Sequence, residues 1–457
     1  MPVEFDTCRV VREVTVAAGR FAPGHLGELT RIVPFEMVDA VLAGTGRVQR
    51  RVRDLPSRVV VYLLLAAVLF EDCGYRQVWA RLVAALDRLP VAHPSSSALA
   101  AARRRVGAAP LRALFDLLRG PVAGPATAGV WWHRRLLVAL DGTSLCCPDT
   151  PANLAVYRKG GGYQGGTGYP MVRLAALIAC GTRALLGAAF GPTTIDERDY
   201  AGQLLNDLHP GMLLLADRNF GYRPMLTAVA GTGADLLIRV KAGIRLPVCR
   251  RCADGSWISR IGPVEVRIIC ATITVTTPAG RRSEAYRLVS TVLDADISAA
   301  ELVRLYHQRW EIETAYLELK STVLGGRVLR ARTPAGLEQE IYALLVTYQV
   351  LRIAICDATI GARDTDPDRG SFTVALHAAR DQVIEAAGVI TDTAPDLTGA
   401  IGRQVLSRLL PERRCRTSPR VVKRAISKHA AHAHSGRFHG PSYKATISID
   451  ILTDPGP

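Results

Sequence analysis

The chain has 457 residues, of which 49% are hydrophobic and 21% charged, a composition that excludes a disordered chain and allows two to four domains. Its 57 lysines and arginines against 41 aspartates and glutamates give a net charge of +16. That excess favours a polyanionic partner such as nucleic acid, although free use of arginine in a GC-rich genome would also produce it.

Nothing in the apolar pattern predicts a membrane protein. The longest apolar run, residues 59–70, falls short of the ~17–25 residues that span a bilayer and predicts a buried helix. Ten scattered cysteines and an N-terminus without a secretory signal favour the cytoplasm. Cys249 and Cys252 have the spacing of half a zinc ribbon, but no second pair follows at a suitable distance, so zinc binding there stays open.

Residues 20–120 have the apolar spacing of helices, interrupted by two prolines and three serines at residues 90–97. A helix predicted after this break starts at a serine cap and ends in Arg103, Arg104 and Arg105. Three cations in a last turn complement the helix dipole. They would equally suit contact with DNA phosphates, and the sequence does not decide between the two interpretations.

Two short apolar runs further along the chain each end in an aspartate. Residues 136–140 precede Asp141, and residues 212–216 precede Asp217. Such runs predict strands buried on both faces, with the aspartate at the strand end. One such aspartate is usually a turn former, whereas two indicate a shared site. Residues 169–190 predict a hairpin, and β-branched residues at 235–292 predict a β-rich block.

The segment YHQRWEIETAYLELK, residues 306–320, is called the signature segment below. At 100° per residue a helical stripe of ~60° holds Tyr306, Arg309, Glu313 and Lys320. The same geometry buries Leu305, Ile312, Tyr316 and Leu319 and predicts that Glu311 and Glu318 face solvent. An i,i+4 ion pair explains Arg309 with Glu313 but not why Tyr306 and Lys320 share their stripe, so we interpret the stripe as functional.

Two aspartates and a glutamate form an oxygen-only ligand set. Such a set suits Mg²⁺ or Mn²⁺ and argues against zinc. Two such ions can activate a nucleophile and stabilise the leaving oxygen of a phosphoryl displacement. The sequence therefore predicts Asp141, Asp217 and Glu313 as catalytic and metal-binding residues, with two metal ions.

The signature segment fits the pattern Tyr, two residues, Arg, three residues, Glu, six residues, Lys. With LDGTS around Asp141 and LADRNFGY around Asp217, it resembles the insertion element 4 family of DDE transposases over roughly residues 20–430. The resemblance implies that the three acids bind the metals and that Tyr306, Arg309 and Lys320 hold phosphates of the transposon end.

The same resemblance implies an α/β fold: an RNase H-like mixed sheet flanked by helices, with an inserted β-rich subdomain. It implies a helical N-terminal DNA-binding domain (residues 1–125), a catalytic domain (126–345, insertion about 223–298) and a helical, basic C-terminal region (346–457). Some relatives stack a tryptophan of the insertion on a flipped base, but no motif assigns Trp257 to that role.

The implied function is cut-and-paste transposition of a bacterial insertion sequence. The protein would bind terminal inverted repeats and target DNA, cleave and join strands, and work as a homodimer in the cytoplasm at the nucleoid, without a membrane. Residues 413–437 are independently a phosphate-binding candidate, or else a solvated tail. Two alternatives stay open: a catalytically silent DNA-binding regulator derived from a transposase, and a host nuclease or resolvase on the same scaffold.

Overall fold

The computed structural model describes residues 24–51, 53–86, 90–159, 168–241, 243–277, 280–362, 365–386, 399–412, 416–417, 443–444 and 446–452. The chain forms two compact units. Unit 1 is Met1–Met212 with Arg309–Leu409, and unit 2 is Leu213–Gln308 with Leu410–Pro457. Apart from residues 416–417, the basic segment 413–437 lies outside the described residues.

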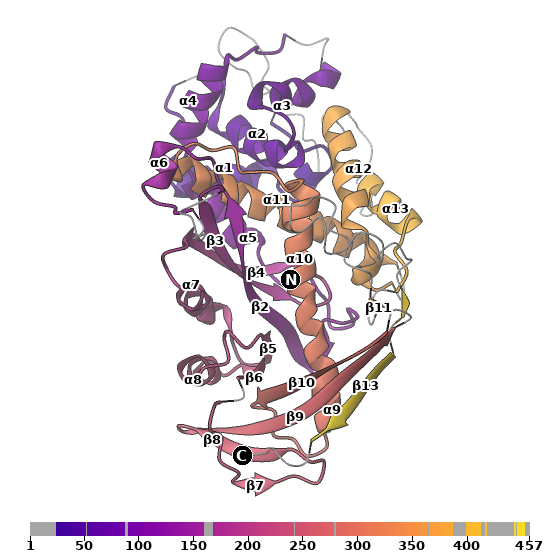
Figure 1. Ribbon diagram of the computed structural model, residues 1–457. Helices are drawn as coiled ribbons and strands as arrows, with labels where there is room; N and C mark the ends of the chain where they lie inside the picture. Colours follow the sequence, from indigo (N-terminus) through magenta and orange to yellow (C-terminus); the bar gives the residue numbers. More distant parts are fainter. Residues whose placement is uncertain are drawn as a thin grey trace, which may run out of the picture. The chain divides into compact units, whose positions relative to one another are not determined.

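Helices make up most of unit 1 (Figure 1). The N-terminal helices are α1 (Phe35–Gly44), α2 (Ser57–Leu69), α3 (Tyr75–Leu82), α4 (Ser96–Val106) and α5 (Ala109–Leu118), with short 3₁₀ turns η2 (Leu29–Arg31) and η3 (Ala84–Leu86). Helix α2 is buried on nearly every side because α1, α3, α4 and α11 pack around it. The predicted helical N-terminal region is therefore confirmed.

The arginines that end α4 have different surroundings. The Arg103 guanidinium lies 3.6 Å from the centroid of the Tyr75 ring, and Arg105 donates to the carbonyl of Leu55 at 2.8 Å. Arg104, between them, is exposed. Two of the three cations are thus engaged within the protein, and Arg104 is the one that presents its side chain outward.

The later helices of unit 1 are α11 (Pro334–Gly361), α12 (Phe372–Ile384) and α13 (Gly399–Ser407), with η7 (Pro367–Arg369) before α12. By length and composition α11 could cross a membrane, but 78% of its apolar window is buried inside the protein. It packs against α2, α5, α12 and α13, and its buried Gln339, Gln349 and Arg352 all have hydrogen-bond partners. These are properties of a core helix.

Four antiparallel strands complete unit 1: β1 (Trp131–Trp132), β2 (Arg135–Cys146), β3 (Met171–Ala179) and β4 (Leu185–Pro192), paired in the order β1-β2-β3-β4. Helix α7 (Glu197–Gln203) packs on β2, β3 and β4; α6 (Pro151–Leu154) and η4 (Leu204–Asp207) are short. Residues 136–140 are buried as predicted. The strand does not end at Asp141, however, because residues 142–146 continue the ladder with β3.

Unit 2 is rich in strands. Strand β5 (Met212–Ala216) pairs in parallel with β6 (Asp235–Arg239), and α8 (Arg223–Gly231) connects them. An antiparallel run follows, in the order β6-β10-β9-β8-β7, formed by β7 (Arg250–Arg251), β8 (Trp257–Ile261), β9 (Val264–Thr277) and β10 (Gly280–Ser290). This β-rich block confirms the prediction for residues 235–292. The unit also contains α9 (Ala299–Tyr306) and the paired β11 (Arg416–Thr417) and β12 (Tyr443–Lys444).

Two features of unit 2 differ from the sequence expectations. The C-terminal region is helical through α12 and α13 but ends in a strand, β13 (Thr446–Ile451), which pairs antiparallel with β9, as Figure 1 shows. Alternate isoleucines suit a strand that lies along a sheet edge. Trp257 is only 1% exposed, so it is a core residue of the β-rich block and cannot stack on a base in this structure.

Candidate active site

The signature segment is not one regular helix. After α9 it passes through a 3₁₀ turn, η5 (His307–Trp310), then helix α10 (Glu311–Leu317) and a π-helical turn, η6 (Glu318–Val323). Short π turns inside helices frequently mark functional sites. The segment also crosses between the units, because unit 2 ends at Gln308 and unit 1 resumes at Arg309.

In unit 1 a single arginine links two of the predicted acids. Arg309 Nη1 lies 3.7 Å from Asp141 Oδ2, and Arg309 Nη2 lies 3.2 Å from Glu313 Oε1. The side chains of Arg309, Asp141 and Glu313 are 10%, 21% and 42% exposed, so the pair of carboxylates opens to solvent on the Glu313 side. One guanidinium between two carboxylates leaves a local excess of negative charge.

Two further contacts connect the signature segment to β2. The Tyr316 hydroxyl donates to the backbone carbonyl of Asp141 at 2.6 Å, and Lys320 Nζ donates to Thr143 Oγ1 at 3.1 Å. Thr143 is two residues from Asp141 and therefore lies on the same face of the strand. The structure thus brings Asp141, Arg309, Glu313 and Lys320 together, as the sequence predicted for this part of the site.

Burial raises the pKa of Tyr316 well above its usual value, and the nearby carboxylates of Asp141 and Glu197 raise this pKa further. Its hydroxyl therefore stays protonated at neutral pH. Tyr316 acts on Asp141 as a hydrogen-bond donor and not as a proton acceptor.

Glu197 is a neighbour of this site that the sequence did not reveal. A Cβ added to Gly142 would lie 1.7 Å from Glu197 Oε1, so the glutamate packs directly on the glycine that follows Asp141. Gly142 was interpreted as a turn residue, but it lies inside β2 and permits this close approach. The acid-rich start of α7 was the available signal.

Unit 2 holds Asp217 and Tyr306. Asp217 follows β5, and its Oδ1 accepts a hydrogen bond from the backbone N–H of Asn219 at 2.8 Å. The Tyr306 hydroxyl donates to the carbonyl of Ala216, the residue before Asp217, at 3.1 Å. Within this unit the first residue of the signature segment is therefore joined to the strand end that carries the second aspartate.

The predicted solvent exposure of Glu311 and Glu318 is wrong. Glu318 is buried and accepts hydrogen bonds from Arg183 at 3.0 Å, from Tyr348 at 3.2 Å and from Arg352; Glu311 accepts from Arg183 at 2.7 Å. The helical projection assumed one buried face, whereas α11 and α12 pack on η6 from the other side. Burial alone would raise the pKa of Glu318, but Arg352 and Arg183 outweigh it and lower this pKa.

The donor chemistry of the acids fits a hard divalent cation, since carboxylate oxygens are the ligands that Mg²⁺ and Mn²⁺ prefer. Among the described residues no group of three or more His, Cys, Asp or Glu side chains is arranged to hold a metal ion. This holds equally for Cys249 and Cys252 and for the acids of the site. Asp141 and Glu313, which already face the same guanidinium, are the two acids whose geometry best suits a shared cation.

Comparison with known proteins identifies the family. The profile of the insertion element 4 transposase N-terminal region matches residues 23–116, and that of the transposase DDE domain matches residues 132–350. The chain belongs to the insertion element 4 family of DDE transposases. The second match contains all the predicted site residues, and the first corresponds to the N-terminal helices.

Two proteins of Escherichia coli (strain K12) are similar to this transposase. The transposase InsG for insertion sequence element IS4 is 26% identical over 403 residues, which cover 85% of this chain and 90% of InsG. The putative transposase InsZ is 26% identical over 212 residues, 44% of this chain and 67% of InsZ. A piggyBac transposase solved by cryo-EM in a synaptic complex with hairpin DNA gives a TM-score of 0.43 at 12% identity, covering 84% and 85% of the two chains.

Proposed function

We propose that this transposase binds the terminal inverted repeats of its own insertion element and catalyses metal-dependent DNA cleavage and strand transfer, in a cut-and-paste pathway. The observation that carries the proposal is the arrangement of Asp141 and Glu313 about Arg309, with Lys320 bound to Thr143 on the same strand. Carboxylates that share one side of a strand with two cations suit a centre that handles both metal ions and phosphates.

Asp141, Asp217 and Glu313 are the proposed catalytic acids. The support for Asp217 is its place after a buried strand in the block LADRNFGY and the match of this region to the DDE domain. When bound, two Mg²⁺ or Mn²⁺ ions supply the activation of the attacking oxygen and the stabilisation of the leaving oxygen. The carboxylates hold these ions, and the hydrogen bonds of Tyr316 and Asn219 to the two aspartates keep the strand ends in place.

Tyr306, Arg309 and Lys320 are the proposed contacts to the phosphates of the transposon end. Arg309 has a planar donor group that can serve a carboxylate and a phosphate at once, and Lys320 is a compact cation that can turn from Thr143 to an incoming phosphate. Tyr306 stands beside the strand end of Asp217. The proposed partners are terminal repeat and target DNA, bound by a homodimer in the bacterial cytoplasm.

The test uses the purified full chain, Mn²⁺ and a labelled duplex that carries the element's end. Asp141→Asn, Asp217→Asn and Glu313→Gln should each abolish nicking while retaining DNA binding. The matched control is Glu338→Gln, which removes an exposed carboxylate at the start of α11 and should cleave like the unaltered protein. Tight binding without cleavage under any divalent ion would favour the silent regulator, and cleavage without regard to the end sequence would favour a nuclease.

A further inference from the structure

The buried side of the signature segment faces a network of charged residues, called the charge network below. It consists of Arg183, Glu311, Glu318, Arg352 and Asp368. Arg183 lies at its centre in the β3–β4 turn: its Nε donates to Glu311 at 2.7 Å, its Nη1 donates to Glu318 at 3.0 Å, and its Nη2 pairs with Asp368. Arg183 is 1% exposed, so all these contacts are made away from water.

The backbone of Arg183 supports a dedicated role for this residue. Its φ is +57°, in the left-handed region that non-glycine residues rarely adopt. Such conformations persist where the surrounding structure holds them, and they cluster at functional sites. The Arg183 carbonyl also accepts a hydrogen bond from Tyr348 at 3.1 Å, so α11 holds the turn as well as the side chain.

The spacing of the contacts matches the spacing of the site. Arg183 holds Glu311 and Glu318, which are seven residues apart, two turns of the helix. On the other face Glu313 and Lys320 are also seven residues apart, and Arg309, Tyr316 and Lys320 connect this face to β2. The same two turns are therefore fixed from both sides, which restrains rotation of α10 about its axis.

Stability alone does not account for such an arrangement. Buried ion pairs can often be replaced by apolar residues at little cost, because desolvation offsets their attraction, and their best-attested use is to fix one arrangement among several. Two arginines among three carboxylates also leave one negative charge in excess, which an apolar core would avoid. A network that fixes geometry fits these facts better than one that only adds stability.

We propose that Arg183 is a positioning residue: through Glu311 and Glu318 it sets the rotation of the signature segment, and thereby aims Glu313 and Lys320 at Asp141 and the bound phosphate. This inference rests on the proposed function, because it assigns Arg183 to the same site. Arg183 itself touches neither metal nor DNA.

The decisive variant is Arg183→Lys, since one ammonium cannot serve three carboxylates. It should lower the rate of Mn²⁺-dependent end cleavage about ten- to a hundred-fold, the size of effect expected from a misplacement near 1 Å. It should also raise several-fold the Mn²⁺ concentration that gives half-maximal cleavage, with KM for the DNA end unchanged. A residue with a merely structural role would change the folded fraction and not the Mn²⁺ requirement of the folded molecules.

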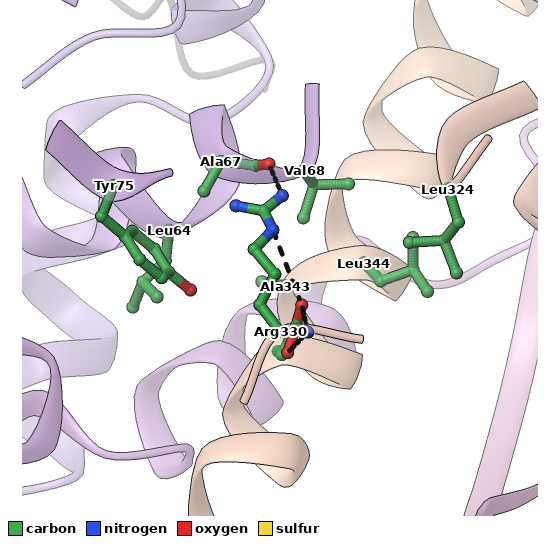
Figure 2. Close-up of a pocket in the computed structure, with 9 residues that line it drawn as sticks. Leu64, Ala67, Val68, Tyr75, Leu324, Arg330, Ala343 and Leu344 are labelled. Carbon is green, nitrogen blue, oxygen red and sulfur yellow. Dashed lines mark hydrogen bonds and ion pairs between the residues drawn. The ribbon is translucent and has the colours of Figure 1, made fainter. Parts of the chain in front are cut away.

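A second buried carboxylate provides the matched control. Glu340 accepts backbone hydrogen bonds from Arg330 at 2.9 Å and from Ala331 at 2.8 Å, and it pairs with the Arg330 side chain. Figure 2 shows Arg330 in this small pocket among Leu64, Ala67 and Tyr75, away from the signature segment. Glu340→Gln should lower stability without changing the Mn²⁺ requirement.

If Arg183→Lys does not fold, Glu311→Gln decides, because it keeps the shape of a side chain that reaches the protein surface and removes its charge. It should shift the rate and the Mn²⁺ requirement in the same directions. Folded variants with unchanged values of both, or values that Glu340→Gln reproduces, would overturn the inference while leaving the proposed function intact. Failure of the unaltered protein to cleave its element's end would instead reject the proposed function.

Discussion

Replacing Tyr316 with phenylalanine removes one hydroxyl from the link between the signature segment and β2. That hydroxyl donates to the Asp141 carbonyl at 2.6 Å, and the tyrosine is buried, so the carbonyl loses a partner that water does not replace. Such a loss costs about 1–3 kcal/mol. If about 1–2 kcal/mol of it enters the barrier because Asp141 is less well held, cleavage slows about five- to thirty-fold.

The assay compares Tyr316→Phe with Tyr62→Phe in thermal unfolding and in end cleavage with Mn²⁺. The Tyr62 hydroxyl donates to the Val33 carbonyl at 2.7 Å in the buried core of the N-terminal helices, so its removal breaks the same kind of bond away from the site. Both variants should lose similar unfolding free energy, and only Tyr316→Phe should cleave slowly. Because the Tyr316 hydroxyl stays protonated, its effect should not vary between neutral and mildly alkaline pH. Equal cleavage by the two variants would refute the reasoning.

Two further predictions concern pH and salt. The pKa of Glu318 is lowered from 4.5, so its stabilising contribution is present above pH 4.5 and is lost as the pH falls through the folded-state pKa; Glu318→Gln should flatten that acid loss in urea unfolding. Burial raises the pKa of Glu340 above 4.5, so the folded state takes up this proton first and stability falls as pH rises from 4.5; Glu340→Gln should remove that fall, and equal pH profiles for the two variants would contradict both signs. Arg104→Ala should reduce the salt dependence of DNA binding by ~0.9 per phosphate contact, whereas Arg103→Ala, which loses its contact with Tyr75, should lower stability alone; a salt slope unchanged in Arg104→Ala would count against DNA contact at α4.

The parts of the fold that the sequence predicted are those set by local patterns. The apolar run before Asp141 is buried in β2, because five consecutive apolar residues can only be accommodated with both faces covered. The contact of Arg309 with Glu313 follows from i,i+4 geometry, which survives even though the segment is irregular. Sequence reasoning succeeded where the interacting residues are neighbours in the chain or share a regular element.

The parts that it missed depend on partners distant in the chain. The burial of Glu318 is set by Arg183 and Arg352, residues more than thirty positions away on elements whose packing no local pattern specifies. The approach of Glu197 to Gly142 likewise requires the placement of α7 on the strands. Each glutamate has the composition of a surface residue, and only the tertiary fold shows that it is enclosed.

The irregular course of the signature segment connects these two kinds of residue. In η6 the backbone bond from the Leu324 N–H to the Leu319 carbonyl spans five residues, so the turn is wider than an α-helical turn and changes the direction of the side chains that follow Glu318. Glu318 lies at the start of this turn, held by Arg183 and Arg352, and Lys320 lies two residues later, bound to Thr143. A buried anchor at the point where the helix widens therefore determines where the lysine points, which a regular helical projection cannot represent.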